Sequence, residues 1–310
     1  MENNKKPFVL FLVGPTACGK TATAIEIAKK INAEIISADS MQVYKGMDIL
    51  SAKPTLTEQK EIPHHLIDIL EPSEEYSVAI FRQKALNCIE QIISREKIPL
   101  IVGGTGMYVK VLTKGLFSDN GKDEQVRKEL TQEAKHKGNE YLYERLKQVD
   151  PKAADKIHQN DMRRVIRALE VYELSNRTIT ELKTEIQGLG EKYNFKIFGI
   201  DRDRRELYQR IDQRVEQMFE AGFLDEVKTL LSNELSHTAR QALGIKQIRE
   251  YLDDKCTLDF AREIIKRDSR RFAKRQLTWF RQEKDIIWIQ ANNETTPQET
   301  AEKIIPLLTI

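Results

Sequence analysis

Short apolar runs bounded by turn residues recur along this chain and predict buried β-strands. They occupy residues 8–13, 33–37, 98–102, 195–201 and 286–289, and residues 63–69 could hold one more short strand. Between them, apolar residues recur with helical spacing and predict helices over residues 21–30, 77–96, 204–219 and 297–308. Strands that alternate with helices in this way are typical of an α/β fold with a parallel sheet.

Strand patterns vanish between residues 119 and 191, where several charged helices are predicted instead. Pro151 and the stretch Gly188, Leu189 and Gly190 punctuate these helices. The strand pattern then resumes at Phe195. We therefore expect an α/β core formed by residues 1–118 and 192–310, with residues 119–191 inserted into it as a helical domain.

The composition is that of a soluble globular protein, because 40% of the 310 residues are hydrophobic and 32% are charged. The apolar runs are too short to span a bilayer, and residues 1–6 are polar, so we expect a cytoplasmic protein without a membrane partner. The net charge of +2 means that any nucleic-acid surface must come from local clustering of basic residues. The three scattered cysteines form no disulfide framework.

One glycine-rich stretch fits a phosphate-binding loop at every fixed position. Between a predicted strand and a predicted helix, the motif G-x-x-x-x-G-K-[ST] is matched by Gly14, Pro15, Thr16, Ala17, Cys18, Gly19, Lys20 and Thr21. Backbone N–H groups of such a loop and of the following helix bind phosphate. Lys20 is expected to reach the terminal phosphate, and the Thr21 hydroxyl to ligate Mg²⁺. We therefore predict a P-loop NTPase-like parallel sheet that binds a diphosphate or a triphosphate.

Two further stretches are expected beside this loop, because the loops that follow parallel strands gather at one sheet edge. Asp39 follows the second strand, where its carboxylate could ligate Mg²⁺ through water or act as a general base. Asp39 could equally be a helix cap or a turn residue. Residues 103–108 form a glycine-rich turn after the third strand and are a second candidate backbone cradle, although such turns are common.

Positive charge is concentrated in two segments. Arg163 and Arg167 lie four residues apart and so share one face of a predicted helix. Residues 262–281 hold eight basic residues against two acidic ones, with Trp279 and Phe280 among them. Basic residues with interleaved aromatic residues can bind a nucleic-acid backbone and stack on bases. The alternative is that the arginines are merely solvated and that Trp279 and Phe280 belong to the core.

These motifs occur in the same order in one known family. Residues 14–21, 39–44, 63–69, 103–108, 160–167 and 271–281 resemble the bacterial tRNA dimethylallyltransferases, also called tRNA isopentenyltransferases. The resemblance covers nearly the whole chain, and residues 39–44 and 273–280 are its most specific markers. It implies transfer of a dimethylallyl group from dimethylallyl diphosphate to the N6 amine of adenosine 37, in tRNAs that read codons beginning with U. It also implies Mg²⁺ as the cofactor, and we expect a monomer.

The resemblance further implies residue roles. Residues of the phosphate loop would bind the diphosphate, Asp39 would take a proton from the N6 amine, and either Arg210 or Arg214 would add positive charge at the leaving group. Because adenosine 37 is stacked in the anticodon loop, it must be extruded to react. Contacts with tRNA are implied for Asp39, Ser40, Met41, Gln42, Thr105, Arg127, Arg163, Arg164, Val165, Ile166, Arg167, Arg240, Gln241, Ala242, Leu243, Gly244, Ile245, Lys274, Arg275, Gln276, Leu277, Thr278, Trp279, Phe280 and Arg281.

Two other classes of protein stay open at this point. A small-molecule enzyme on the same fold, such as a nucleotide kinase or an adenylate isopentenyltransferase, would use the phosphate loop but leaves the insertion and the basic residues 262–281 unexplained. A non-catalytic RNA-binding or nucleotide-switch protein would give Asp39 no task. Cys18 stands where many members of the resembling family have Ser, and a thiol at a helix N-terminus is expected to be open to oxidation or alkylation.

Overall fold

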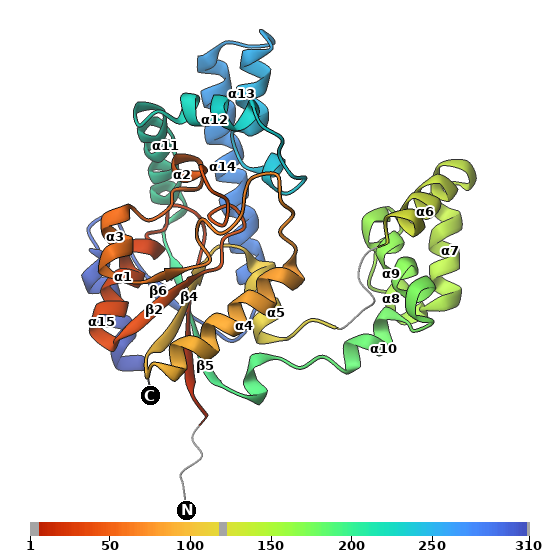
Figure 1. The fold of residues 1–310 in the computed structure, drawn as a ribbon, viewed down its shortest axis with the longest axis horizontal. Coiled ribbons are helices and arrows are strands. Elements are labelled where there is room, and N and C mark those ends of the chain that lie inside the picture. Colours follow the sequence, from red (N-terminus) through yellow and green to blue (C-terminus); the bar gives the residue numbers. More distant parts are fainter. Residues whose placement is uncertain (1–5, 118–122, 309–310) are drawn as a thin grey trace, which may run out of the picture. The chain divides into compact units, whose positions relative to one another are not determined.

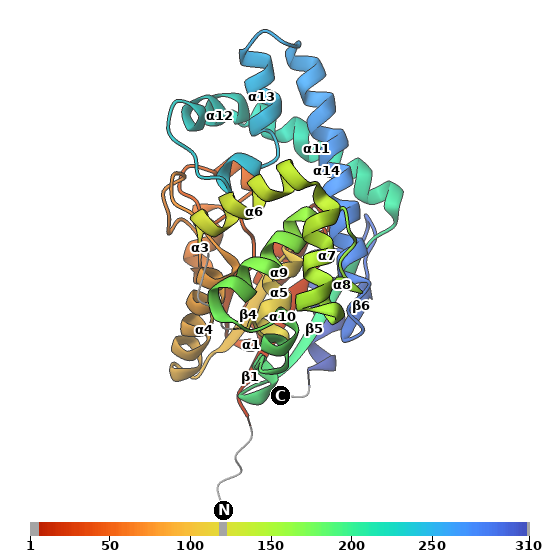
Figure 2. The same ribbon diagram turned by 90° about the vertical axis from the view of Figure 1, so that its right-hand side faces the viewer.

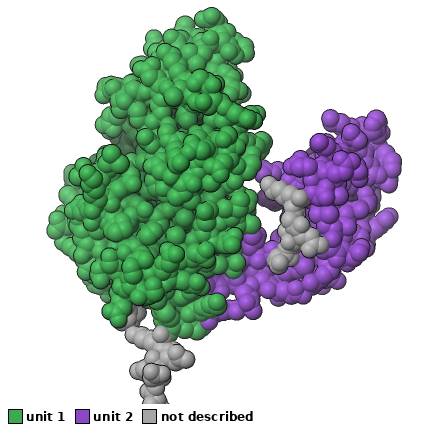
Figure 3. All heavy atoms as spheres, viewed as in Figure 1, with its two compact units in different colours: residues 1–113, 192–310 green, residues 114–191 purple. Residues whose placement is uncertain are grey.

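The structure is a computed structural model that describes residues 6–117 and 123–308. The chain divides into two compact units, coloured green and purple in Figure 3. Unit 1 comprises Met1–Thr113 and Lys192–Ile310, and unit 2 comprises Lys114–Glu191. The start of the insertion expected at residue 119 lies outside the described residues. Within the two described ranges, no helix is long and apolar enough to cross a membrane.

Unit 1 is built on a six-stranded sheet with the order β3-β2-β4-β1-β5-β6 (Figure 1). All neighbouring strands are parallel, so the expected α/β fold is confirmed. Five of the six strands match the predicted ranges to within one residue. The strands are β1 (Phe8–Val13), β2 (Ala33–Ser37), β3 (His64–His65), β4 (Ile98–Gly103), β5 (Asn194–Asp201) and β6 (Ile286–Gln290).

The strand register sets where the phosphate loop lies. β1 is flanked by β4 and β5, and its last residue, Val13, pairs with Gly103 and with Gly199. These strands therefore end at the same level of the sheet, and the segments that follow them share one edge. β2 ends at that edge too, because Ser37 pairs with Val102.

β3 is much shorter than the seven residues in which it was predicted. Only His64 and His65 pair with β2. Leu66 and Asp68 have φ values of 63° and 54°, a left-handed conformation that interrupts an extended strand. The apolar residues Leu66 and Ile67 are nevertheless buried, which explains why their pattern resembles a strand.

Helices cover both faces of this sheet. α1 and α15 pack together on one face, whereas α4 and α5 pack together on the other (Figures 1 and 2). The helices of unit 1 are α1 (Lys20–Ile31), α2 (Asp48–Ser51), α3 (Leu56–Glu61), α4 (Val78–Ser94), α5 (Gly106–Thr113), α11 (Arg204–Glu220), α12 (Phe223–Leu231), α13 (Ile245–Leu252), α14 (Leu258–Phe280) and α15 (Pro297–Ile304), with 3₁₀ turns η2 (Ala239–Gln241) and η3 (Ile305–Leu307).

α11 follows β5 in the chain and packs against α14. α13 and α14 form a helical hairpin that both ribbon views show. The terminal helix ends at Ile304, four residues before the predicted end, and the chain continues as the 3₁₀ turn that contains Pro306. Proline lacks the N–H that a continuing helix needs, which accounts for the difference.

Unit 2 consists of helices around its own hydrophobic core. The core includes Leu142 and Leu146 of α7 and Val165 and Leu169 of α9, all buried. The helices are α6 (Glu124–Lys137), α7 (Asn139–Val149), α8 (Pro151–Ala154), α9 (Met162–Ser175) and α10 (Ile179–Thr184), followed by the 3₁₀ turn η1 (Leu189–Glu191).

The entry and exit segments of unit 2 lie side by side. A Cβ on Gly115 would be only 2.3 Å from Ile186 Cγ2 and 2.4 Å from the carbonyl oxygen of Gln187. Gly115 also has a φ of 89°, so both its conformation and its surroundings require glycine.

Candidate active site

The phosphate loop connects β1 to α1. Gly14 begins the loop with a φ of 150°, and a Cβ there would lie 2.9 Å from Cys18 Sγ and 3.1 Å from the carbonyl oxygen of Ile200. Gly19 ends the loop in the left-handed conformation and forms the N-cap of α1. With glycine at both ends, the loop can turn tightly between β1 and α1. The N-terminus of α1 then faces the space next to the loop.

A cavity of about 640 Å³ borders the phosphate loop. Thr16, Ala17, Gly19, Lys20 and Thr21 line one side of it. Other walls come from the ends of β2 and β4 and from α11 and α14, through Asp39, Gln42, Gly103, Gly104, Arg210, Arg214, Phe272 and Gln276. The phosphate loop and Asp39 thus face one cavity, at the sheet edge where parallel α/β sheets bind ligands.

Lys20 and Thr21 are half-buried at the cavity wall. Lys20 Nζ donates a hydrogen bond to the carbonyl oxygen of Pro15 at 2.6 Å, which holds the ammonium over the loop. Within residues 6–117 and 123–308, the Thr21 hydroxyl has no hydrogen-bond partner. A cation and a hydroxyl oxygen are therefore both available to a ligand.

Arg210 and Arg214 both contact the phosphate loop, and which of them faces a bound diphosphate stays a prediction. Arg210 Nε donates to the carbonyl oxygen of Ala17 at 2.9 Å, and Arg214 Nη1 donates to Thr16 Oγ1 at 3.1 Å. Burial lowers the pKa of Arg214, and the nearby Asp39 carboxylate partly offsets this effect. Arginine stays protonated in proteins, so two cations adjoin the loop.

Asp39 serves as a turn residue and also faces the cavity. Its Oδ1 accepts a hydrogen bond from the backbone N–H of Met41 at 2.8 Å, which is an Asx-type turn. This bond fixes the orientation of the carboxylate. The turn interpretation and the catalytic interpretation of Asp39 are therefore compatible.

A second cavity of about 310 Å³ adjoins the first. The two share Thr16, Ala17, Asp39, Ser51, Arg214 and Phe272 as lining residues. The second is also lined by several residues for which tRNA contacts are expected, namely Ser40, Met41, Thr105, Gln241, Ala242, Leu243 and Arg275. Asp39 thus borders both the phosphate-loop cavity and a cavity lined by candidate RNA-contacting residues.

Other candidate tRNA contacts of unit 1 lie elsewhere. Gln42 lines the first cavity and accepts a hydrogen bond from the Ser37 hydroxyl at 2.8 Å. Arg240 is exposed, and Gly244 is buried immediately before α13. Arg281 is exposed and forms an ion pair with Asp201 at 3.4 Å.

Several expected tRNA contacts fall on side chains that are buried or partly buried. Val165 belongs to the core of unit 2 and is 0% exposed. Ile245 and Phe280 are 1% and 0% exposed in unit 1, and Leu277 packs against its core. The Gln276 amide is also turned inward. Helical periodicity explains this result, since a continuous segment of a packed helix always presents some residues to the core.

The candidate arginines of unit 2 fall into two groups. Arg163 and Arg164 are exposed, and Arg164 pairs with Asp161. Arg127 and Arg167 instead converge on the fully buried carboxylate of Glu170, with distances of 2.8, 2.9 and 2.7 Å. Burial would raise the pKa of Glu170, but these two arginines outweigh it and lower the pKa. Ile166, which lies between these arginines in the sequence, packs against the core of unit 2.

A basic groove runs along α14. Its volume is about 420 Å³, and it is lined by Arg271, Lys274, Arg275, Thr278, Trp279 and Gln282. Trp279 is half-buried, with Lys110 Nζ 5.6 Å from the centroid of the indole. Of the two aromatic residues in this segment, Trp279 therefore faces the groove and Phe280 the core.

Cys18 does not have the access that a reactive thiol needs. Its side chain is 0% exposed and packs within the core of unit 1. The Sγ atom lies beneath Gly14, where an added Cβ would approach it to 2.9 Å. The expectation of an alkylatable or oxidisable thiol is therefore wrong for the folded protein.

Arg202 is a part of the site that the sequence did not reveal. It follows β5 directly, and its side chain is buried beneath the phosphate loop. Arg202 Nε donates to the carbonyl oxygen of Cys18 at 2.8 Å, and Nη1 donates to the carbonyl oxygen of Asn292. The position of Arg202 directly after a parallel strand was the sequence feature that could have indicated its place in the site.

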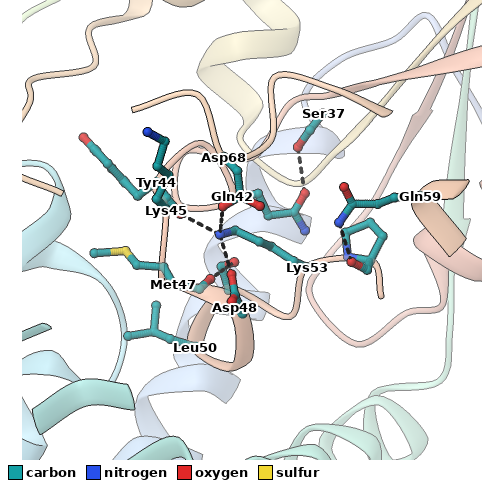
Figure 4. A network of polar contacts seen from close by, with 12 residues as sticks. Ser37, Gln42, Tyr44, Lys45, Met47, Asp48, Leu50, Lys53, Gln59 and Asp68 are labelled. Carbon is teal, nitrogen blue, oxygen red and sulfur yellow. Dashed lines mark hydrogen bonds and ion pairs between the residues drawn. The ribbon is translucent and has the colours of Figure 1, made fainter. Parts of the chain in front are cut away.

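Lys53 stabilises the segment that follows β2 (Figure 4). Its Nζ donates to the carbonyl oxygen of Tyr44 at 2.6 Å and to Asp48 Oδ1 at 2.7 Å, and it also pairs with Asp68. The Lys53 side chain is 3% exposed. This network fixes the wall of the first cavity that contains Gln42, and the sequence did not indicate it.

Comparisons with known proteins give a consistent result. A family model described as IPP transferase matches residues 42–283, and one described as isopentenyl transferase matches residues 7–68. The tRNA dimethylallyltransferase of Acetivibrio thermocellus is 50% identical over 96% of this chain and 95% of its own length. That of Carboxydothermus hydrogenoformans is 51% identical over 96% of each chain.

Solved structures agree with these sequence matches. The full-length tRNA isopentenylpyrophosphate transferase of Bacillus halodurans superposes with a TM-score of 0.72 at 41% identity, covering 98% of this chain and 96% of that one. A eukaryotic dimethylallyltransferase acting on tRNA superposes with a TM-score of 0.80 at 30% identity, covering 96% and 77%. The two bacterial relatives named above are tRNA dimethylallyltransferases. With these matches along nearly its full length, the chain belongs to the IPP transferase family.

Proposed function

We propose that this protein transfers a dimethylallyl group from dimethylallyl diphosphate to N6 of adenosine 37, in tRNAs that read codons beginning with U. The observation that carries the proposal is the position of Asp39. Its carboxylate borders the cavity of the phosphate loop and also the cavity lined by candidate RNA-contacting residues. A single acceptor between two substrate cavities fits a transfer reaction between them.

The first cavity is the donor site in this proposal. The backbone of the phosphate loop binds the diphosphate, and Lys20, Arg210 and Arg214 surround it with positive charge. As the bond between C1 of the donor and the diphosphate oxygen breaks, negative charge grows on the leaving group. Fixed cations and N–H groups next to that charge lower the barrier.

Mg²⁺ is proposed as the cofactor, with Thr21 as its protein ligand. In the described ranges 6–117 and 123–308, no cluster of three or more His, Cys, Asp or Glu residues could hold a metal on its own. A single hydroxyl next to a phosphate-binding loop nevertheless fits, because Mg²⁺ is usually held by one or two protein oxygens together with substrate phosphates. When bound, the ion would neutralise charge on the diphosphate.

The second cavity receives the extruded adenine. An adenine N6 amine is a weak nucleophile, because its lone pair is delocalised into the ring. Asp39 accepts a hydrogen bond from it and takes its proton while the new bond between N6 and C1 forms. The products are the N6-dimethylallyl base, free diphosphate and a proton on Asp39 that passes to water.

Mass spectrometry of tRNA nucleosides tests this function. The protein is incubated with tRNA, dimethylallyl diphosphate and Mg²⁺, and the nucleosides are compared with a sample that lacks the donor. We expect N6-dimethylallyladenosine in the complete reaction and none in the sample that lacks the donor. Its absence would contradict the proposal.

The alternative hypothesis, an enzyme that acts on a small molecule, is tested in the same assay. Free AMP replaces tRNA as the acceptor, and a second sample contains ATP and AMP without the prenyl donor. Prenylated AMP would favour an adenylate isopentenyltransferase, and ADP formation would favour a nucleotide kinase. We expect neither product, because a mononucleotide is too small to need the basic groove on α14 or the exposed Arg163 and Arg164.

We further propose that the protein acts as a monomer.

A further inference from the structure

α14 presents two different faces along one stretch of sequence. Arg271, Lys274 and Arg275 line the basic groove on the outer face. Ala273 and Gln276 are buried on the opposite face, with Gln276 only 7% exposed. A buried polar side chain on a helix that also carries a basic surface needs a physical reason, because burial of an unpaired amide costs free energy.

The reason is a bridge between two loops of the donor cavity. Gln276 Oε1 accepts a hydrogen bond from the backbone N–H of Thr16 at 2.8 Å, and Nε2 donates to the carbonyl oxygen of Gly104 at 3.0 Å. The two partners fix the orientation of the amide, since a backbone N–H can only donate and a carbonyl can only accept. Gly104 permits the approach, because a Cβ there would lie 2.2 Å from Gln276 Nε2.

Thr16 is therefore held from two helices. Gln276 of α14 binds its N–H, and Arg214 of α11 binds its hydroxyl. Thr16 lines both cavities, so a shift of this residue would alter the donor site and the acceptor site together.

We propose that Gln276 is a positioning residue that couples the RNA-facing helix α14 to the phosphate loop. RNA bound on the outer face restrains α14, and the amide passes that restraint to Thr16 and so to the diphosphate site. The coupling is reciprocal, because two ligands that favour the same arrangement raise each other's affinity by the same factor. This inference rests on the proposed function, since it takes the basic groove as an RNA surface.

The test measures binding and not product formation, which separates it from the test of the proposed function. Inorganic diphosphate with Mg²⁺ is titrated by calorimetry into the full-length protein, with and without a saturating tRNA anticodon stem-loop. We expect RNA to tighten diphosphate binding about 5-fold or more in the unaltered protein, the lower end of typical coupling. In Gln276→Leu the factor should fall to nearly 1, while RNA affinity without diphosphate changes little.

A matched control is Gln209→Leu, which makes the same substitution at an exposed position of α11 outside both cavities. It should keep the coupling factor of the unaltered protein. If Gln276→Leu fails to fold, Gln276→Glu decides, because the carboxylate can still accept from Thr16 but cannot donate to Gly104. We expect a smaller factor there than in the unaltered protein. Equal factors in the unaltered protein and the Gln276 variant, or no coupling in the unaltered protein, would overturn the inference.

Discussion

Arg202 Nε donates a hydrogen bond to the carbonyl oxygen of Cys18 at 2.8 Å, so a buried cation underlies the phosphate loop. The Arg202 side chain is 8% exposed, and within residues 6–117 and 123–308 no carboxylate forms an ion pair with it. Burial is the main cause that lowers the pKa of Arg202, and Arg210 adds to it. A buried charge without an ion-pair partner is costly; the nearby Glu206 offsets part of this cost, and we expect a diphosphate bound on the loop to offset more of it.

The first prediction follows from this charge. Arg202→Met should weaken diphosphate binding about 10-fold, on the scale of ~1.5 kcal/mol for a lost charge-assisted contact. The rise in melting temperature on adding diphosphate should shrink in parallel. Arg204→Met, an exposed substitution at the start of α11, is the control and should leave both quantities unchanged. An unaltered diphosphate affinity in Arg202→Met would show that Arg202 only supports the fold.

The second prediction concerns Asp39. Asp39→Asn keeps an oxygen that can accept the N–H of Met41, so the turn should persist. The amide cannot take a proton from the adenine amine, so the single-turnover rate should fall about 10²-fold or more, the usual scale for a lost general base. Affinities for donor and tRNA should stay close to those of the unaltered protein. A rate within about threefold of the unaltered protein would return Asp39 to a purely structural role in the turn.

The third prediction concerns the basic groove on α14. If Lys274 contacts an RNA phosphate, Lys274→Gln should reduce the slope of log affinity against log salt by roughly 0.7 to 0.9. Lys30→Gln is the control, because Lys30 lies on α1 and pairs with Glu302. Filter binding of tRNA at several salt concentrations gives both slopes. Identical slopes for the two variants would mean that Lys274 is simply solvated.

The fourth prediction concerns stability against pH. Glu34 of β2 is buried and bonded to Arg95 at 2.6 Å, His65 at 2.7 Å and Lys97 at 3.0 Å. Burial would raise the pKa of Glu34, but these three partners outweigh it and lower the pKa to about 2. The unfolded chain binds this proton near pH 4.5, so the stabilisation is complete above that pH and is lost as the pH falls towards 2.

Glu34→Gln measures this contribution directly. Its free energy of unfolding should be about 3 kcal/mol below that of the unaltered protein at pH 7, and the difference should shrink between pH 4.5 and 2. Urea unfolding at a series of pH values provides the comparison. Glu302→Gln, at an exposed pair, should show little difference at any pH. A Glu34→Gln difference that does not vary with pH would contradict the assignment.

The inner strands of the sheet were predictable because they are buried on both faces. β1 is buried over nearly its whole length and appears in the sequence as an uninterrupted apolar run, whereas β2 is equally buried although it contains Glu34 and Ser37. The helix α3 was missed because it buries no residue and therefore has no apolar stripe. Its capping box, Thr55 with Glu58, was the only local signal, and that signal does not depend on burial.

The candidate site was predictable only where its residues are contiguous. The phosphate loop and Asp39 each lie in a short motif that follows a strand. The resemblance implied a tRNA contact for Gln276 but not its bond to the phosphate loop, and Arg202 was not expected in the site at all, because the partners Thr16 and Cys18 lie 260 and 184 residues away along the chain. No local pattern encodes such a contact; it arises only when α14 and β5 reach the same edge of the sheet.

The close approach of Gly115 to Gln187 has a consequence for how the chain folds. β5 pairs with β1 although the whole of unit 2 lies between them in the sequence. Without structure in unit 2, this pairing would have to close a long loop. Once unit 2 folds around its own core, its touching ends reduce that loop to a short hairpin-like crossing. The length of the insertion then has little effect on the pairing of β5 with β1, as long as the core of unit 2 is kept.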